Sequence, residues 1–130
     1  MTVIDASAFV VAVASSPAHA SAAQFLQHSA LHAPAHFDVE VVSALRGLAK
    51  SGKFSTEGCL EALAILQDLR IEREAHGPLL ERIWELRHNL TPYDAAYVAL
   101  AEALGVPLVT GDRRLARAPG IRCRVELVEG

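Results

Sequence analysis

Hydrophobic positions along the chain switch repeatedly between short continuous runs and helical spacing. Apolar runs at residues 2–4 and 106–110 are typical of buried strands, and the alternation at residues 121–128 favours a last strand. Residues 31–35 and 70–75 are weaker strand candidates. Helical spacing predicts helices at residues 6–14, 18–28 and 92–104, from Phe37 to near Gly52, after Ser55 and after Pro78. Because strands alternate with helices and no tight hairpin signal occurs, we expect a three-layer α/β/α sandwich around a mainly parallel sheet of four or five strands.

Residues 89–116 carry the clearest local signals. Thr91 is a helix N-cap residue, Pro92 suits the first helical position, and Asp94 is an acid three residues after the cap. The small apolar residues that follow predict a helix buried against the sheet, and Gly105 is expected to end it. Asp112 comes directly after the next strand and Gly111, so two carboxylates lie at the ends of structural elements.

Composition narrows the class of protein. A chain of 130 residues, 52% hydrophobic and 21% charged, predicts one domain over residues 1–130 with a substantial core. The formal net charge of -3 gives no bulk attraction to nucleic acid, so a nucleic-acid substrate would need local basic groups or metal ions.

Cellular location is predicted from the cysteines and the apolar runs. Cys59 and Cys123 lie far apart and have no metal-ligand spacing, so we expect reduced thiols in the cytoplasm. The apolar run at residues 9–14 is short, and the residues before it include Asp5 but no Lys or Arg. We therefore expect neither a signal peptide nor a membrane span.

Four acids are candidates for a shared site: Asp5, Glu40, Asp94 and Asp112. Asp5 ends the first strand, and ligands of parallel α/β sheets bind beyond the carboxyl ends of strands. Glu40 shares a helical stripe with Ala44 and Gly47, whose small size predicts close packing beside a crevice. Carboxylates brought together repel one another unless protons or cations intervene, and Mg²⁺ and Mn²⁺ prefer oxygen ligands.

Each acid also has a purely structural explanation. Asp94 completes the cap begun by Thr91, Glu40 is a solvated helix residue, and Asp112 is a turn residue after glycine. Asp5 is harder to explain in this way, because the Ala-Ser that follows it is not a turn signal. We therefore expect Asp5 to have a function.

Three segments carry a resemblance to a known family: VIDASAF, DVEVVSALRGL and LTPYDAAYVALAEALGVPLVTGDRRLA. With the closing strand, they resemble PIN domains, and in particular the VapC toxins of bacterial toxin–antitoxin systems. The resemblance implies a Mg²⁺- or Mn²⁺-dependent endoribonuclease that leaves 5′-phosphate and 3′-hydroxyl ends. It places the catalytic and metal-binding acids at Asp5, Glu40, Asp94 and Asp112, with supporting hydroxyls at Ser7 and Thr110. Ser43 stands where many members have asparagine.

The same resemblance implies two protein partners, a cognate antitoxin that inhibits the enzyme and a second copy in a homodimer. The helix containing Leu60 to Leu69, and Trp84, serve either such an interface or the core. Arg113, Arg114 and Arg117 follow Asp112 and are candidates for contact with RNA phosphates; alternatively they form a solvated face or pair with the antitoxin.

Histidines add little, because the six in the chain show no metal-type cluster. His36, four residues before Glu40, is the one histidine that helical geometry brings near the acids.

Two other functions are compatible with acids at strand ends. A phosphotransfer protein of the receiver type requires a late lysine, but none follows Lys53, and a haloacid-dehalogenase-like site requires an Asp where this chain has Ser7. The second alternative is a nuclease-like fold that has lost activity and acts as a binding module. The presence of all four acids argues against it.

Overall fold

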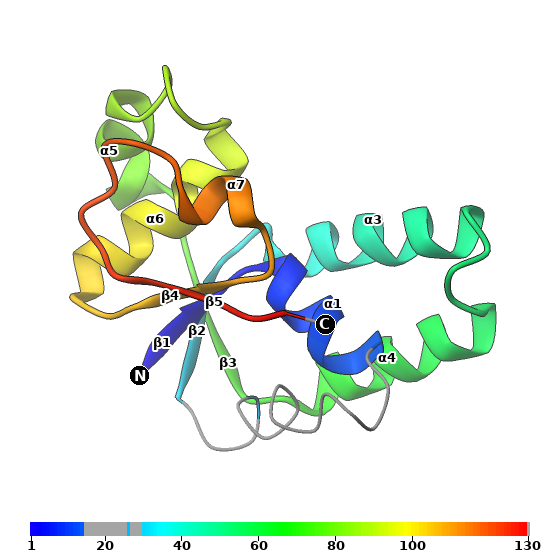
Figure 1. The fold of residues 1–130 in the computed structure, drawn as a ribbon. Helices are drawn as coiled ribbons and strands as arrows, with labels where there is room; N and C mark the ends of the chain where they lie inside the picture. Colours follow the sequence, from blue (N-terminus) through cyan, green and yellow to red (C-terminus); the bar gives the residue numbers. More distant parts are fainter. Residues whose placement is uncertain (15–25, 27–29, 130) are drawn as a thin grey trace.

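The computed structural model describes residues 1–14, 26 and 30–129, and at its centre lies a sheet of five parallel strands (Figure 1). The strands are β1 (Thr2–Ile4), β2 (Leu31–Pro34), β3 (Ile71–Glu74), β4 (Leu108–Thr110) and β5 (Val125–Leu127). Their order is β3-β2-β1-β4-β5, and every pairing is parallel. The predicted parallel sheet is therefore confirmed, with β1 at its centre.

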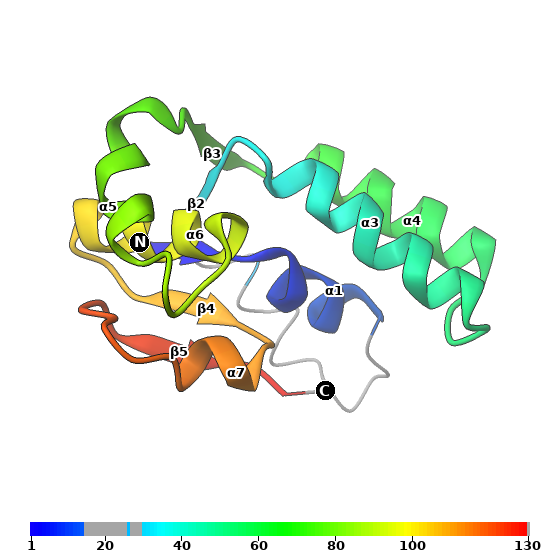
Figure 2. The same cartoon turned by 90° about the horizontal axis from the view of Figure 1, so that it is seen from above.

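Helices cover both faces of the sheet, which gives the three predicted layers. They are α1 (Ala6–Ala14), α3 (Phe37–Lys50), α4 (Thr56–Asp68), the 3-10 helix η2 (Gly77–Leu79), α5 (Leu80–Glu85), α6 (Pro92–Leu104) and α7 (Arg113–Ala116). α5 and α6 lie on one side, whereas α1, α3 and α4 lie on the other, with the α3–α4 pair extending past the sheet (Figures 1 and 2). The helix predicted at residues 18–28 falls outside the described residues, apart from Leu26.

Local capping signals set several helix boundaries where the sequence predicts them. The Ser55 side chain accepts a hydrogen bond from the backbone N of Gly58 at 2.9 Å and begins α4. α6 spans the predicted Pro92–Leu104 and ends at Gly105, whose φ of 67° is the left-handed conformation that glycine adopts readily. The helix predicted after Pro78 is shorter than expected, and its buried residues Leu79 and Leu86 flank α5.

The core lies between the sheet and its helices. Phe9 of α1 and Phe37 of α3 meet edge to face, with ring centroids 6.2 Å apart. Residues 95–101 of α6 are all buried, so the start of this helix is fixed against the centre of the sheet. No helix in the described part of the chain has the length and apolarity needed to cross a membrane.

One glycine is required by close approach of the backbone. A Cβ on Gly111 would lie 3.0 Å from Val11 Cγ2 and 3.2 Å from the carbonyl oxygen of Ser7. The absence of a side chain therefore lets the end of β4 pass close to α1.

Gly47 is different, because a Cβ there would meet nothing within 4 Å. The expectation that Gly47 permits close packing of α3 was wrong: that part of the helix has open space around it.

Candidate active site: a carboxylate-lined cavity

β1 and β4 are neighbours in the sheet, and this brings together acids from near the two ends of the chain. Ile4 pairs with Val109 in the parallel ladder, so Asp5 and Asp112 both emerge at the carboxyl edge of these neighbouring strands. In the order β3-β2-β1-β4-β5, this is where connections leave in opposite directions, and such switch points form ligand crevices.

All four predicted acids line one cavity of about 260 Å³ at this edge. Its lining consists of Asp5, Ala6, Ser7, Glu40, Ser43, Ala44, Asp94, Tyr97 and Asp112. Each acid lies at the start, or in the first turn or so, of a different helix, where unpaired backbone N–H groups favour negative charge. The elements therefore bring together side chains that are up to 107 positions apart in sequence.

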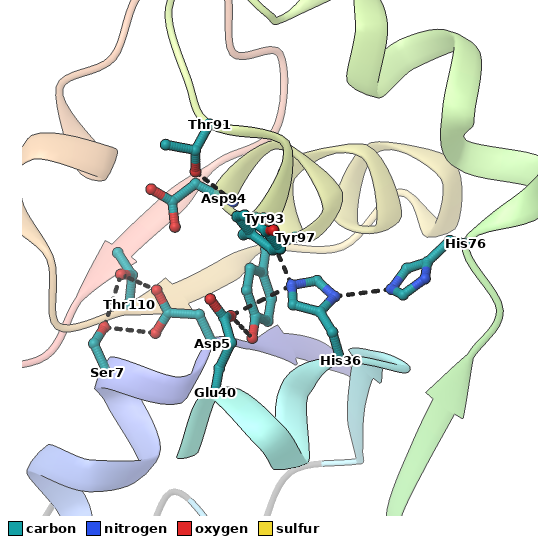
Figure 3. Close-up of polar contacts among 10 residues, drawn as sticks. All are labelled: Asp5, Ser7, His36, Glu40, His76, Thr91, Tyr93, Asp94, Tyr97 and Thr110. Carbon is teal, nitrogen blue, oxygen red and sulfur yellow. Dashed lines mark hydrogen bonds and ion pairs between the residues drawn. The ribbon is translucent and has the colours of Figure 1, made fainter. Parts of the chain in front are cut away.

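Asp5 is buried and has hydrogen bonds on both carboxylate oxygens (Figure 3). Ser7 Oγ and the backbone N of Ala8 donate to Oδ1 at 2.7 and 2.9 Å, and the Thr110 hydroxyl donates to Oδ2. The Ala8 contact caps α1, so the expectation that Asp5 has little structural purpose was wrong. Three of the carboxylate's roughly four lone-pair positions are occupied, which leaves Oδ2 able to accept one more ligand.

The hydroxyls of Ser7 and Thr110 connect Asp5 to the loop that carries Asp112. Ser7 Oγ accepts from the backbone N of Gly111 at 2.8 Å, and Thr110 Oγ1 accepts from the backbone N of Asp112 at 3.0 Å. Asp112 in turn accepts from the backbone N of Arg114 at 2.9 Å and caps α7. One polar network thus fixes two of the acids relative to each other.

Burial raises the pKa of Asp5, and the negative charge of Asp94 adds to this effect against the opposing hydrogen bonds. Burial likewise raises the pKa of Asp94, reinforced by the charges of Glu40 and Asp112 and weakened by Thr91 and Arg114. For these two acids, burial and neighbouring negative charge therefore disfavour the ionised form.

Asp94 has contacts that fit both of its explanations. Thr91 Oγ1 accepts a hydrogen bond from the backbone N of Asp94 at 3.2 Å, as an N-cap should. Within the described residues, the reciprocal bond of a capping box, from the backbone N of Thr91 to the Asp94 carboxylate, is not formed. The carboxylate lines the cavity and also interacts with the Thr91 side chain, which lowers its pKa.

Glu40 is held by two side chains that contact the same oxygen. The Tyr97 hydroxyl donates to Oε1 at 2.6 Å, and His36 Nε2 lies 3.3 Å from that oxygen. Burial alone would raise the pKa of Glu40, but the hydrogen bonds from His36 and Tyr97 outweigh it and lower the pKa. His36 was the predicted histidine, whereas Tyr97 was missed. Its signal was available: it is a hydroxyl one turn after Asp94, within a run of small apolar residues.

The donor set suits a hard divalent cation. It consists of carboxylates, and neighbouring hydroxyls orient one of them. The acids line the cavity without closing on one point, because no three of the described His, Cys, Asp and Glu residues are grouped tightly enough to enclose an ion. A cation held by three of these acids therefore requires their carboxylates to move closer together, whereas Mg²⁺ bound by one or two of them would take its remaining ligands from water and substrate phosphate.

The three predicted arginines have different surroundings. Arg114 lines a second cavity of about 250 Å³ that shares Asp94 and Asp112 with the first. Arg113 Nη2 is 2.9 Å from Glu129 Oε1, and Arg117 is the C-cap of α7. The structure therefore places Arg114 nearest to the acids.

The fold and site define an α/β protein with an acid-lined cavity at the switch point of a parallel sheet. Comparison with known proteins agrees with this class. Residues 2–121 match the PIN domain family. Ribonuclease VapC1 of Mycobacterium tuberculosis is 48% identical over 128 residues, covering 97% of this chain and 96% of that protein. The chain therefore belongs to the PIN-domain family and, within it, to the VapC-type toxins.

Solved structures show the same fold at lower identity. VapC20 of Mycobacterium tuberculosis, described as a sarcin-ricin loop cleaving toxin, has a TM-score of 0.64 and 18% identity over 94% of this chain and 97% of its own. VapBC2 from Rickettsia felis, bound to a DNA fragment from their promoter, has a TM-score of 0.62 and 18% identity over 98% of both chains.

Proposed function

We propose that this protein is an endoribonuclease toxin that hydrolyses phosphodiester bonds in RNA with the help of Mg²⁺ or Mn²⁺. The observation that carries the proposal is that Asp5, Glu40, Asp94 and Asp112 line one cavity at the carboxyl edge of β1 and β4. The name of the similar VapC1, a ribonuclease, supports RNA as the substrate. Residues 1–130 act as one PIN-like unit in this proposal.

Each residue has a distinct task. Asp5, Asp94 and Asp112 hold the cation, and Glu40 binds a second cation or orients the attacking water. Ser7 and Thr110 keep Asp5 in place through the hydrogen bonds described above. When bound, a divalent cation supplies positive charge to the phosphate oxygens and lowers the pKa of a water molecule toward about 7.

RNA reaches the acids past Arg114. Its side chain is 96% exposed, and its ion pair with Asp112 is long, with Nε 3.8 Å from Oδ1. A cation this weakly engaged beside the acids is suited to a phosphate that flanks the scissile bond. Arg113 and Arg117 contact phosphates of the same RNA strand, farther from the acids.

The proposal includes a cognate antitoxin and a homodimer. Large apolar side chains stay exposed in the structure: Leu60 and Ile65 on α4, and Leu80 and Trp84 on α5. Such side chains are suited to protein interfaces. The Rickettsia felis VapBC2 structure supports an antitoxin partner. The cytoplasmic location expected from the two cysteines stays a prediction.

The alternatives from the sequence fit the cavity less well. A receiver-like site needs a lysine, and the residues that line the described cavity include none. An inactive binding module has no need of four acids around one space. Both alternatives predict that wild type cleaves RNA no more than a variant that lacks one of the cavity acids.

The test is cleavage of a short fluorescent RNA by purified, antitoxin-free protein with Mg²⁺, with Mn²⁺ and with EDTA. We expect cleavage with either metal, none with EDTA, and loss in Asp5→Asn and Asp94→Asn. Asp68→Asn, at an exposed acid on α4, is the matched control and should cleave like wild type. No cleavage by wild type with either metal, together with equal toxicity of Asp5→Asn and wild type in cells, would overturn the proposal.

A further inference from the structure

Glu40 is anchored through one oxygen of its carboxylate, and this leaves the other oxygen for chemistry. Oε1 accepts the Tyr97 hydroxyl at 2.6 Å and lies 3.3 Å from His36 Nε2. Within the described part of the chain, no group donates to Oε2. The Glu40 side chain is 32% exposed and lines the acid cavity, so without these anchors its carboxylate would have room to rotate.

The chemistry of its neighbours fixes the hydrogen on His36. Nε2 lies between two acceptors, Glu40 Oε1 and the carbonyl oxygen of Tyr93, which is 3.1 Å away. Acceptors on both sides require that Nε2 carries the N–H. The opposite nitrogen, Nδ1, is 2.8 Å from His76 Nε2. His76 therefore holds the far side of the ring, from the connection between β3 and η2 (Figure 3).

Tyr97 has almost no freedom to move. The residue is 1% exposed and belongs to the buried stretch of α6, whose first turn carries Asp94. Its ring packs against His36 with centroids 5.0 Å apart. The same rigid helix therefore presents Asp94 directly and sets the position of Glu40 through the Tyr97 hydroxyl.

We propose that Tyr97 and His36 are positioning residues for Glu40, with His76 orienting His36, so that Glu40 presents Oε2 alone to the cation or the attacking water. The inference rests on the proposed metal-dependent function and adds a support that the sequence resemblance does not assign. Donors from the buried face of α6 and from the start of α3 converge on one oxygen, as expected of outer contacts that orient a metal-binding carboxylate.

A double-mutant cycle tests this proposal, with Mn²⁺ affinity measured by electron paramagnetic resonance as the readout. Tyr97→Phe removes one hydroxyl and keeps the buried ring. It should weaken Mn²⁺ binding roughly 10–100-fold in the wild-type background and have little further effect in a Glu40→Ala background. Thr2→Val is the matched control, because it removes a buried hydroxyl that has no hydrogen-bond partner among the described residues.

His36 is tested by rescue. His36→Ala should weaken Mn²⁺ binding, whereas His36→Gln should restore most of it, because a glutamine amide can supply a donor close to the position of Nε2. His88→Ala, at an exposed histidine, should leave the affinity unchanged. An equal loss for Tyr97→Phe in both backgrounds, or no rescue by glutamine, would assign these residues a merely structural role and overturn the inference.

A metal-free readout separates this inference from the proposed function. The Tyr97 hydroxyl proton, shielded by burial and bonded to a carboxylate, should give a slowly exchanging nuclear magnetic resonance signal that disappears in Glu40→Ala. If wild type binds no Mn²⁺ but shows this signal, the metal-dependent function fails and the positioning contact stands. If Mn²⁺ binds and the signal is absent from wild type, the positioning inference fails alone.

Discussion

The hydroxyl of Thr110 donates a hydrogen bond to Oδ2 of Asp5, which joins two residues 105 positions apart. The contact exists because β1 and β4 are parallel neighbours in the middle of the sheet. Thr110 is fully buried, and its oxygen also accepts from the backbone N of Asp112. One hydroxyl therefore orients a carboxylate from the first strand and the loop after the fourth.

Thr110→Val should destabilise the protein by roughly 1–3 kcal/mol, because it leaves an acceptor on Asp5 and the backbone N of Asp112 without their partner. Thr110→Ser keeps the hydroxyl and removes a methyl group, which costs about 1 kcal/mol. Urea denaturation of the two variants, both metal-free, measures the difference. A serine variant as unstable as the valine variant would mean that packing, and not the hydrogen bond, is what Thr110 contributes.

Asp94→Asn should leave the metal-free melting temperature at neutral pH unchanged or raise it. The reason is that burial and the charges of Glu40 and Asp112 disfavour the ionised carboxylate, and asparagine removes that charge. In wild type, Mg²⁺ should raise the melting temperature, and in the variant it should do so much less. Asp68→Asn is the control in both conditions. A large fall in the metal-free melting temperature would favour the capping role, whose loss costs about 0.5–2 kcal/mol.

Glu102 anchors the segment before β5 and should give the fold a pH dependence that arises outside the acid-lined cavity. Arg82 donates to its two oxygens at 2.7 and 3.2 Å, and the backbone N of Arg122 donates at 2.8 Å. Arg82 also reaches the carbonyl oxygen of Gly120 at 2.8 Å. Burial alone would raise the pKa of Glu102, but the hydrogen bonds from Arg82 and Arg122 lower it below the ordinary 4.5.

Because the folded-state pKa is the lower one, the ionised carboxylate stabilises the fold above pH 4.5 and this contribution is lost as the pH falls through the folded value. Glu102→Gln should therefore cost roughly 1.5–3 kcal/mol at neutral pH. The difference in unfolding free energy between this variant and wild type should become smaller as the pH falls. Thermal melts across pH 3–7 measure it, with the exposed Glu81→Gln as control. A gap that stays constant with pH would contradict the assignment.

Arg114→Ala should weaken RNA binding without regard to sequence and reduce the dependence of affinity on salt. Loss of one phosphate contact lowers the slope of log affinity against log salt by about 0.7 for single-stranded RNA. The measurement is fluorescence anisotropy of a short RNA bound to the Asp5→Asn variant. Arg87→Ala is the control, because the Arg87 guanidinium lies over the Trp84 ring, 4.4 Å from its centroid. An unchanged slope in Arg114→Ala would exclude a phosphate contact there.

Local sequence determined much of the fold. The Thr91 cap, Pro92 and Gly105 set both ends of α6, because capping depends only on neighbouring backbone groups. The alternation of strands and helices was enough to predict the parallel sheet. The capping bond from the backbone N of Ala8 to Asp5 is equally local, because Asp5 stands directly before the helix that starts at Ala6.

Tertiary structure alone decided how the acids and their supports meet. The resemblance named the four acids, but strand order placed Asp5 beside Asp112, and the contact of His36 with His76 spans 40 positions. Hydrophobic periodicity reports which side of an element is buried, and it carries no information on which element covers that side. That pairing is set by packing over long sequence separations. The sequence therefore supplied the carboxylates, and only the fold showed that Tyr97 and His36 contact one of them.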